Sequence, residues 1–362
     1  MTISKANTLA AQTDYEVWVI VADNSGDRFF ELSPAVHFVN LAVNYYDDDW
    51  KSRWNILKGI IVKRRVHKRR LAEHLHIINP DVVIGVGQSE KNILPCIKGD
   101  WAKIREYHFA RNYRWLLARG LFAKFIAIVG DSTERMFLKK YDKIVLLTYE
   151  DWITNWKGTD KIVIIPNPSA FNVDKQSLLA DKRIIAVGQL CFQKNFSSLI
   201  RSFSIVSKRF PNWKLDIFGD GDEKTLLTRL ITDLSLEGNV SLRGNSPQIS
   251  REMLRSSLFV LSSRIEGWAM VITEAMSCGL PIVSYACPCG PKDIITDEVN
   301  GFLVPVGDEN MLAERICQLI EDEELRKRMG AAAFDRSRDF DLDKIIQMWM
   351  NLFEELIKEK KK

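Results

Sequence analysis

Short runs of apolar and β-branched residues alternate with longer amphipathic stretches along the chain. This alternation is typical of parallel α/β sheets, in which helices join buried strands. The pattern predicts three strands in the first half and five in the second, at residues 16–22, 81–86, 143–148, 183–187, 214–218, 240–243, 258–261 and 281–284. We therefore expect an α/β fold in which helices fill the gaps between strands.

The length and the breaks in this pattern indicate two domains, and so a cleft between them. A chain of 362 residues suits two domains of roughly 150–200 residues each. VIIPNP (163–168) contains two prolines, which cannot continue a helix or a central strand, so we expect domains at 1–165 and 166–340. Residues 341–362 contain an amphipathic helix expected to pack back across both. Because the chain opens in a helix-like segment, the first strand of the N-terminal domain is expected to be missing.

The composition is that of a soluble globular protein, with 46% hydrophobic and 27% charged residues. No apolar run reaches the roughly 18–20 residues needed to span a bilayer, and no signal peptide is indicated. The six cysteines show no disulfide framework. These features predict a cytoplasmic protein.

Charge is concentrated in the first half of the chain. Residues 1–165 contain 25 basic and 19 acidic residues, whereas the whole chain has a net charge of only +4. Lys51–Arg70 contains nine basic residues interleaved with Trp54 and four isoleucine or leucine residues. Such a segment can lie peripherally on an anionic inner membrane face, or it can be a solvated basic helix. A nucleic-acid partner is not expected, because the overall balance is near neutral.

Two carboxylates, Glu266 and Glu274, lie eight residues apart within SSRIEGWAMVITEAMSCGLP (262–281). The pattern places Glu266 in a loop after a strand and Glu274 in the second turn of a helix that begins near Ala269. A helix N-terminus has unpaired N–H groups and a partial positive charge, so it suits an anionic diphosphate. Glu274 can then accept hydrogen bonds from ribose hydroxyls, while Glu266 faces the group on the distal phosphate. The alternative, two surface glutamates, is disfavoured because Glu274 has apolar neighbours.

Two further loops follow predicted strands and add phosphate-binding chemistry. In VGQLCFQKNF (187–196), Lys194 precedes a helix and can neutralise charge on a leaving diphosphate. In IFGDGDE (217–223), Gly219 and Gly221 fit a tight turn near a ligand, but Lys224 breaks the dinucleotide-binding fingerprint. A nicotinamide enzyme is therefore disfavoured.

No metal or cofactor is expected. The pairs Asp47–Asp49 and Asp220–Asp222 could hold a divalent ion with phosphates, but both are better explained as polar loop residues. Cys287-Pro288-Cys289 is too tight for a usual zinc site and is predicted to form a rigid turn.

The residues around Glu266 resemble a known family. EGWAMVITE is similar to the Glu-x7-Glu element of the retaining glycosyltransferases of family 4, which belong to the group 1 glycosyltransferases and have two Rossmann-like domains facing each other across a cleft (GT-B fold). The resemblance continues through VGQLCFQKNF, FGDGD, CGPKDII and NGFLVPVGD, and it covers residues 182–308. In the first half, FFELSPAVHFVNLAVNYY, PDVVIG, REYHFAR and VIIPNP resemble the bacterial subgroup that builds exopolysaccharide, capsule and lipopolysaccharide.

The resemblance implies a hexosyltransferase that moves a sugar onto a glycan or polyprenyl-diphosphate-linked acceptor. The donor is expected to be a UDP-sugar. The α configuration of the sugar would be retained, and no carboxylate nucleophile would be needed. The resemblance also implies the following roles: Glu274 for the ribose, Lys194 for the diphosphate, Glu266 and His108 as active-site residues facing the sugar, and Gly188, Gln189, Gly219, Met270, Val271 and Ile272 as donor contacts.

Two departures from the family keep other functions open. Gln189 stands where many members have an arginine, and the chain begins after the place of the family's first strand and glycine-rich loop. A nucleotide-sugar-binding protein with impaired catalysis is one alternative. A UDP-sugar epimerase on the same fold is another.

Overall fold

The computed structural model describes residues 2–23, 31–45, 53–117, 120–121, 134–171 and 175–361, with only the backbone described for residues 53–60, 114 and 117. The Asp47–Asp49 pair lies outside the described residues. So do the side chains of Trp54, Ile56, Leu57 and Ile60 in the predicted basic segment.

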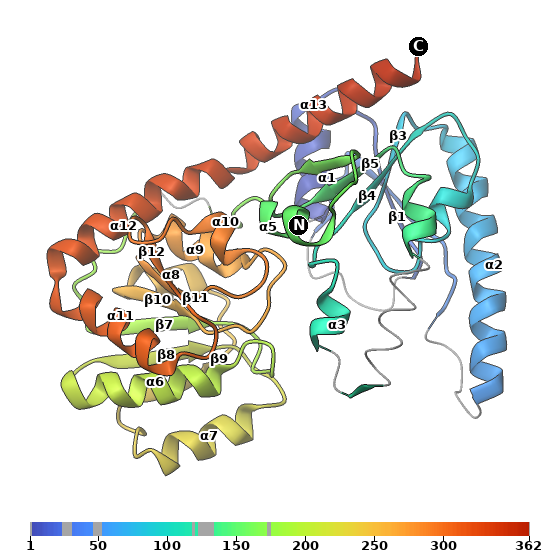
Figure 1. The fold of residues 1–362 in the computed structure, drawn as a ribbon. Coiled ribbons are helices and arrows are strands. Elements are labelled where there is room, and N and C mark those ends of the chain that lie inside the picture. Colours follow the sequence, from blue (N-terminus) through green and yellow to red (C-terminus); the bar gives the residue numbers. More distant parts are fainter. Residues whose placement is uncertain are drawn as a thin grey trace.

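The N-terminal half contains two parallel sheets with helices around them (Figure 1). Four strands pair in the order β3-β4-β5-β6, and within the described residues β1 pairs only with β2. The elements of this half are α1 (Thr2–Gln12), β1 (Val17–Val21), β2 (Val36–Asn40), α2 (Arg53–Ile78), β3 (Val82–Gly85), η1 (Leu94–Cys96), β4 (Ala102–Glu106), α3 (Tyr113–Leu117), β5 (Lys143–Leu146), α5 (Tyr149–Asn155) and β6 (Ile162–Ile164).

The C-terminal half contains one parallel sheet of six strands in the order β12-β11-β10-β7-β8-β9, which is the doubly wound arrangement. Its elements are β7 (Arg183–Val187), α6 (Phe196–Arg209), β8 (Lys214–Phe218), α7 (Lys224–Asp233), β9 (Val240–Gly244), α8 (Ile249–Leu254), β10 (Leu258–Leu261), α9 (Met270–Ser277), β11 (Ile282–Tyr285), α10 (Pro291–Ile294), β12 (Gly301–Val304), α11 (Glu309–Glu321), α12 (Glu323–Ser337), η2 (Arg338–Phe340) and α13 (Leu342–Lys360).

Strands β7 and β10 in the middle of this second sheet are apolar at consecutive positions because both of their faces are covered. In β7, Ile184 and Ala186 join the hydrophobic cluster that includes α6 and α11 residues, whereas Ile185 joins the cluster that includes α9 residues. Side chains alternate between faces along a strand, so one short apolar run contributes to two cores.

Helix α13 leaves the C-terminal domain and packs on the N-terminal sheets. Its buried residues are the stripe that the sequence predicts, Ile345, Ile346, Trp349, Leu352, Phe353 and Leu356. They form one hydrophobic cluster with Leu9 of α1, Ala102 and Ile104 of β4, and Val145 of β5. Figure 1 shows the helix running across the top of both halves.

The strands predicted in the second half match those observed to within about one residue, although β12 is additional. In the first half, β2, β4 and β6 are additional. The segment predicted as the crossing between domains begins inside β6, where Val163 and Ile164 pair with β5. The chain therefore leaves the four-stranded sheet of the N-terminal half after Ile164. The six-stranded sheet of the C-terminal half begins with β7 at Arg183.

Candidate active site

The site predicted from the sequence lies where the strand order of the C-terminal sheet reverses. The first strand of this sheet, β7, has β8 on one side and β10 on the other, so the connections from β7 and from β10 leave in opposite directions. Ligands of doubly wound sheets bind in the crevice that opens at the carboxyl ends of such strands. The loop after β7 contains Lys194 and the loop after β10 contains Glu266, which is how the topology brings these two residues together.

Lys194 and Glu266 form an ion pair with 2.6 Å between Nζ and Oε1. Ser263 donates its hydroxyl to the same carboxylate oxygen at 2.6 Å. The carboxylate of Glu266 is almost fully buried, with a side-chain exposure of 7%, and the lysine is 18% exposed. The sequence predicts Lys194 beside a diphosphate and Glu266 beside a sugar; the structure adds a direct bond between them.

The two loops are fixed to each other by further hydrogen bonds. Ser262 donates its hydroxyl to the carbonyl of Lys194 at 2.9 Å, and Gln193 donates its amide to the carbonyl of Ile265, also at 2.9 Å. Arg264 donates to the side-chain oxygen of Asn195 at 2.7 Å. These bonds hold the Lys194–Glu266 pair in one geometry before any ligand arrives.

Glu274 lies in the second turn of α9, as predicted. Ala269, the residue at the start of this helix, makes no side-chain capping hydrogen bond and has a positive φ of 54°. Burial raises the pKa of Glu274 to about 7, while the positive charge of Lys194 acts to lower it. The carboxyl group therefore lies in an environment that disfavours its charged form, and a hydrogen-bonding ligand would relieve this.

The glycine turn after β8 packs directly against the turn after β7. A Cβ atom on Gly219 would lie 1.9 Å from the carbonyl oxygen of Gly188, and Gly219 has a φ of +136°. Above Gly188 lies the aliphatic part of the Lys194 side chain. Gln189 precedes the turn that leads to Lys194. These residues are the predicted donor contacts at the ends of β7 and β8.

We expect Gly219→Ala to destabilise the protein by about 2 kcal/mol or more, because alanine meets both a backbone clash and a disfavoured φ. Thermal unfolding would measure this. Gly238→Ala is the matched control: its Cβ atom would have no neighbour within 4 Å. Equal melting temperatures for the two variants would contradict the prediction.

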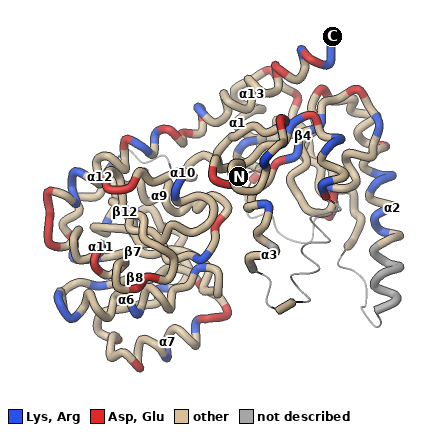
Figure 2. Tube along the Cα trace, in the orientation of Figure 1, with Lys and Arg blue, Asp and Glu red and all other residues tan. Residues whose placement is uncertain are grey.

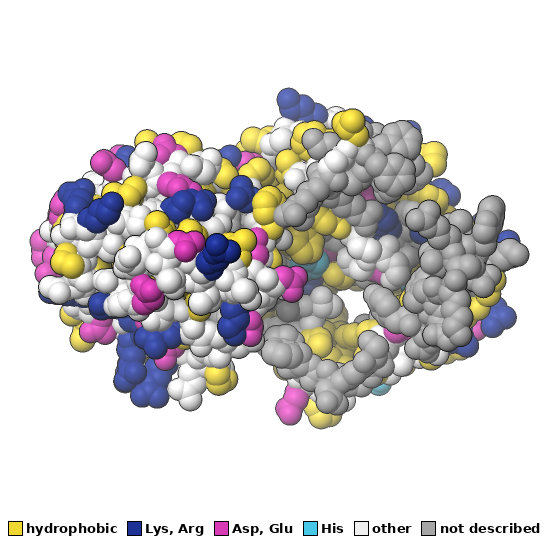
Figure 3. Space-filling view, turned by 90° about the horizontal axis from the view of Figure 1, so that it is seen from below, with side chains coloured by type: hydrophobic (Ala, Val, Ile, Leu, Met, Phe, Trp, Pro, Cys, Tyr) yellow, Lys and Arg dark blue, Asp and Glu magenta, His cyan; other side chains and the backbone are white. Residues whose placement is uncertain are grey.

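His108 approaches the site from the N-terminal domain. It lies two residues after the end of β4. A Cβ atom added to Gly267 would lie 2.0 Å from the backbone carbonyl oxygen of His108. The loop that holds Glu266 therefore touches the backbone at His108. Burial lowers the pKa of this histidine, and the nearby Glu106 acts to raise it. Seen from below, the molecule is hollowed between the two lobes, with hydrophobic side chains along the hollow (Figure 3).

Beside this contact, the start of α5 in the N-terminal domain docks on the turn around α10. Asp293 accepts backbone hydrogen bonds from Tyr149 and Glu150 at 2.5 and 3.2 Å. Glu150 in turn bonds Lys292 at 2.6 Å and the backbone N–H of Cys289 at 3.0 Å. The Cys-Pro-Cys turn thus forms part of the domain interface.

Ser263 is the site residue that the sequence reasoning missed. Its position three residues before Glu266, in the loop after a buried strand, is the signal that could have indicated it. Asp220 of the Asp220–Asp222 pair bonds Gly221 and Lys224 within its own turn. Within the described ranges there is no group of three or more metal-ligating side chains.

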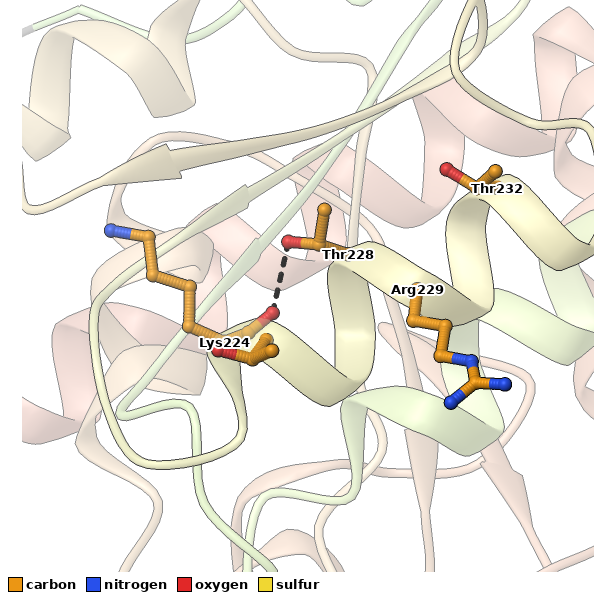
Figure 4. Close-up of a pocket in the computed structure, with 5 residues that line it drawn as sticks. Lys224, Thr228, Arg229 and Thr232 are labelled. Atoms are coloured by element: carbon orange, nitrogen blue, oxygen red, sulfur yellow. Dashed lines mark hydrogen bonds between the residues drawn. The ribbon is translucent and has the colours of Figure 1, made fainter.

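A surface depression of about 550 Å³ lies over α7 and is lined by Lys224, Thr225, Thr228, Arg229 and Thr232. All of these residues belong to one helix (Figure 4), and Thr228 donates its hydroxyl to the carbonyl of Lys224 at 2.9 Å. None of the predicted site residues lines it.

Comparison with solved structures defines the class of the fold. The chain superposes on sucrose-phosphate synthase from Thermosynechococcus elongatus with a TM-score of 0.79 over 98% of this chain and 92% of that one, at 16% sequence identity. This is the GT-B arrangement of two Rossmann-like domains, and the predicted α/β fold class is confirmed.

The sequence comparisons then define the family. The model of the family "Glycosyl transferases group 1" matches residues 171–336. An uncharacterized glycosyltransferase of Methanocaldococcus jannaschii is 32% identical over 284 residues, which cover 65% of this chain and 68% of that protein. The amylovoran biosynthesis glycosyltransferase AmsD of Erwinia amylovora is also 32% identical, over 58% of this chain and 62% of its own length. The chain belongs to the group 1 glycosyltransferases, which are transferases of the hexosyltransferase type.

Proposed function

We propose that this protein is a retaining glycosyltransferase that moves a sugar from a UDP-sugar onto a glycan or polyprenyl-diphosphate-linked acceptor during the synthesis of a cell-surface polysaccharide. The observation that carries the proposal is the Lys194–Glu266 ion pair at the strand reversal of the C-terminal sheet. It puts a fixed cation and a carboxylate in one crevice, next to the start of α9 and to Glu274.

Each of these side chains then has a defined role in the reaction. Glu274 accepts hydrogen bonds from the ribose hydroxyls, and the N–H groups at the start of α9 together with Lys194 bind the diphosphate. An ammonium group has three N–H donors, so Lys194 can bond Glu266 and a phosphate oxygen at once. Glu266 accepts from hydroxyls of the transferred sugar, and His108 faces that sugar from the other domain. As the glycosidic bond breaks, Lys194 stabilises the negative charge on the departing UDP.

Names of similar proteins support the donor and the acceptor. Solved structures of pneumococcal O-GlcNAc transferase GtfA and of Anabaena HepE contain UDP. A relative from Campylobacter jejuni, 33% identical over 46% of this chain, transfers N-acetylgalactosamine to a diphospho-undecaprenol-linked sugar. AmsD serves amylovoran biosynthesis. We infer a UDP-sugar donor and a polyprenyl-diphosphate-linked or glycan acceptor from these names.

The test is to incubate the protein with a panel of UDP-sugars and diphospho-polyprenol acceptors and to follow UDP release and product. Anomeric NMR signals of an α-linked product from an α-linked donor are the expected result. An epimerised UDP-sugar formed without acceptor would instead support an epimerase. Thermal stabilisation by UDP with no product from any donor would support a nucleotide-sugar-binding protein.

Transfer is expected to continue at an unchanged rate in about 5–10 mM EDTA. The reason is that Lys194 and the start of α9 supply the positive charge that a metal ion supplies in metal-dependent transferases. Comparing initial rates with and without added Mg²⁺ measures this. A loss of activity in EDTA that Mg²⁺ restores would overturn the metal-independent proposal.

We further propose that α2 binds an anionic membrane surface. Lys and Arg follow one another along its described turns (Figure 2), with Ile61 and Val62 more than half exposed beside them. No helix in the described ranges is both long and apolar enough to cross a bilayer. We expect vesicles with anionic lipid to retain the protein at low salt and to release it as salt increases. Vesicles of neutral lipid are the control, and equal retention on both would contradict the proposal.

A further inference from the structure

The face of β4 changes from apolar to polar as it approaches the cleft. Side chains two residues apart lie on one face of a strand, so Ala102, Ile104 and Glu106 share a face, and His108 continues the same alternation past the strand end. Ala102 and Ile104 are buried under α1 and α13. Glu106 is therefore placed between a hydrophobic core and the active-site histidine.

Glu106 is bound by a lysine from α1. Lys5 Nζ lies 2.8 and 2.7 Å from the two carboxylate oxygens of Glu106, whose side chain is 2% exposed. The same ammonium group lies 3.8 Å from the ring centroid of Trp349 in α13. Burial lowers the pKa of Lys5, and the charge of Glu106 acts to raise it.

His108 faces the same carboxylate but does not bond it tightly. Its Nε2 lies 3.5 Å from Glu106 Oε1, and within the part of the chain that the structure describes this buried nitrogen has no hydrogen-bond partner. The imidazole is thus held close to a negative charge that Lys5 already neutralises in part.

A buried ion pair costs desolvation energy that its attraction repays only in part, and two apolar residues would often be as stable. We propose that Glu106 and Lys5 are positioning residues for His108: Glu106 orients the imidazole and favours its protonated form, and Lys5 limits that effect. The predicted effect on turnover rests on the proposed function, because it assumes that His108 takes part in sugar transfer. The predicted effect on the charge of His108 does not, because it is present without substrate.

The described charged groups that face His108 come from two elements. Glu106 of β4 raises the pKa of the histidine, and Lys5 of α1 and Arg105 of β4 lower it in decreasing order, in addition to the larger effect of burial. Removing the negative charge should therefore lower the pKa of His108. Removal of the Lys5 charge alone should raise it.

The experiment is a histidine NMR titration of the intact protein, which has five histidines, with His108→Gln used to assign the signal. We expect the pKa of His108 to fall in Glu106→Gln and to rise in Lys5→Met. Where turnover is measurable, Glu106→Gln should reduce kcat by about 10- to 100-fold with little change in the KM for the donor. If the protonated imidazole is the active form, the alkaline limb of the pH profile should move to lower pH in Glu106→Gln.

The matched control is Lys143–Glu355, another Lys–Glu pair at 2.6 Å, which ties β5 to α13. Lys143→Met and Glu355→Gln should leave the pKa of His108 unchanged. If Lys5→Met does not fold, the double variant Lys5→Met/Glu106→Gln removes both charges, and its His108 pKa should lie below the wild-type value because Glu106 has the larger effect.

A His108 pKa that stays at the wild-type value in Glu106→Gln would overturn the inference, whatever happens to turnover. Failure of the proposed function is distinguishable: the wild-type protein would then transfer no sugar, while the opposite pKa changes in the two variants would still be observed.

Discussion

Lys194→Met is expected to slow sugar transfer by about 100- to 1,000-fold, the usual cost of removing one fixed group that stabilises charge in a transition state. Lys194 lies 2.6 Å from Glu266 and is held by hydrogen bonds between the loops after β7 and β10. Its charge is therefore in place before UDP begins to leave. Because the effect acts on the departing diphosphate, kcat should fall more than UDP affinity.

Initial rates with the UDP-sugar found to be the donor measure this change. Lys327→Met is the control: this lysine is half exposed on α12 and pairs with Glu323 within its own helix. Circular dichroism should show both variants folded. A Lys194→Met enzyme with wild-type kcat would remove Lys194 from the mechanism.

Glu274→Gln is expected to weaken UDP binding and at the same time to stabilise the free protein. The pKa of Glu274 is raised by burial from 4.5 to about 7 in the folded chain. The folded state therefore binds more protons than the unfolded state between these values, so stability falls as pH rises through that window. At pH 8 the full cost, up to about 3 kcal/mol, is present, and glutamine removes it.

Urea unfolding of the wild type and Glu274→Gln at pH 4 and pH 8 measures this cost, with the difference expected at pH 8 only. UDP affinity of the wild type should rise as pH increases through about 7 and level off near pH 8, because the carboxylate accepts two ribose hydroxyls better than the neutral acid does. In Glu274→Gln the affinity should be lower and should lose this dependence on pH. A wild-type affinity that does not change across this range would argue against ribose binding by Glu274.

The sequence predicts the C-terminal half well because its central strands are buried on both faces and contain uninterrupted apolar runs, such as residues 184–187 in β7 and Leu258–Leu261 in β10. In the N-terminal half, β4 reads AKIRE and carries three charged residues. Arg105 can be buried there because its guanidinium group donates hydrogen bonds to the carbonyl oxygens of Gly85 and Gly87, at 3.1 and 2.6 Å. Tertiary partners of this kind cannot be read from a local pattern.

The same limit applies to the site. The positions of Glu274 in its helix and of Lys194 before α6 follow from the spacing of apolar residues and turns. The bond between Lys194 and Glu266 joins residues 72 positions apart and depends on the strand order. Lys5 and Glu106, 101 positions apart, meet only because α1 and β4 share a core with α13.

The route of α13 also sets an order for biosynthesis. Ile104 and Val145 are buried under Trp349, Leu352 and Phe353 of α13. These α13 residues are translated about two hundred residues later. While the ribosome is still making the C-terminal domain, that face of the four-stranded N-terminal sheet has α1 on it but lacks α13. The N-terminal domain therefore cannot complete its folding as an independent unit during translation, and a nascent chain halted before residue 342 should be a substrate for chaperones.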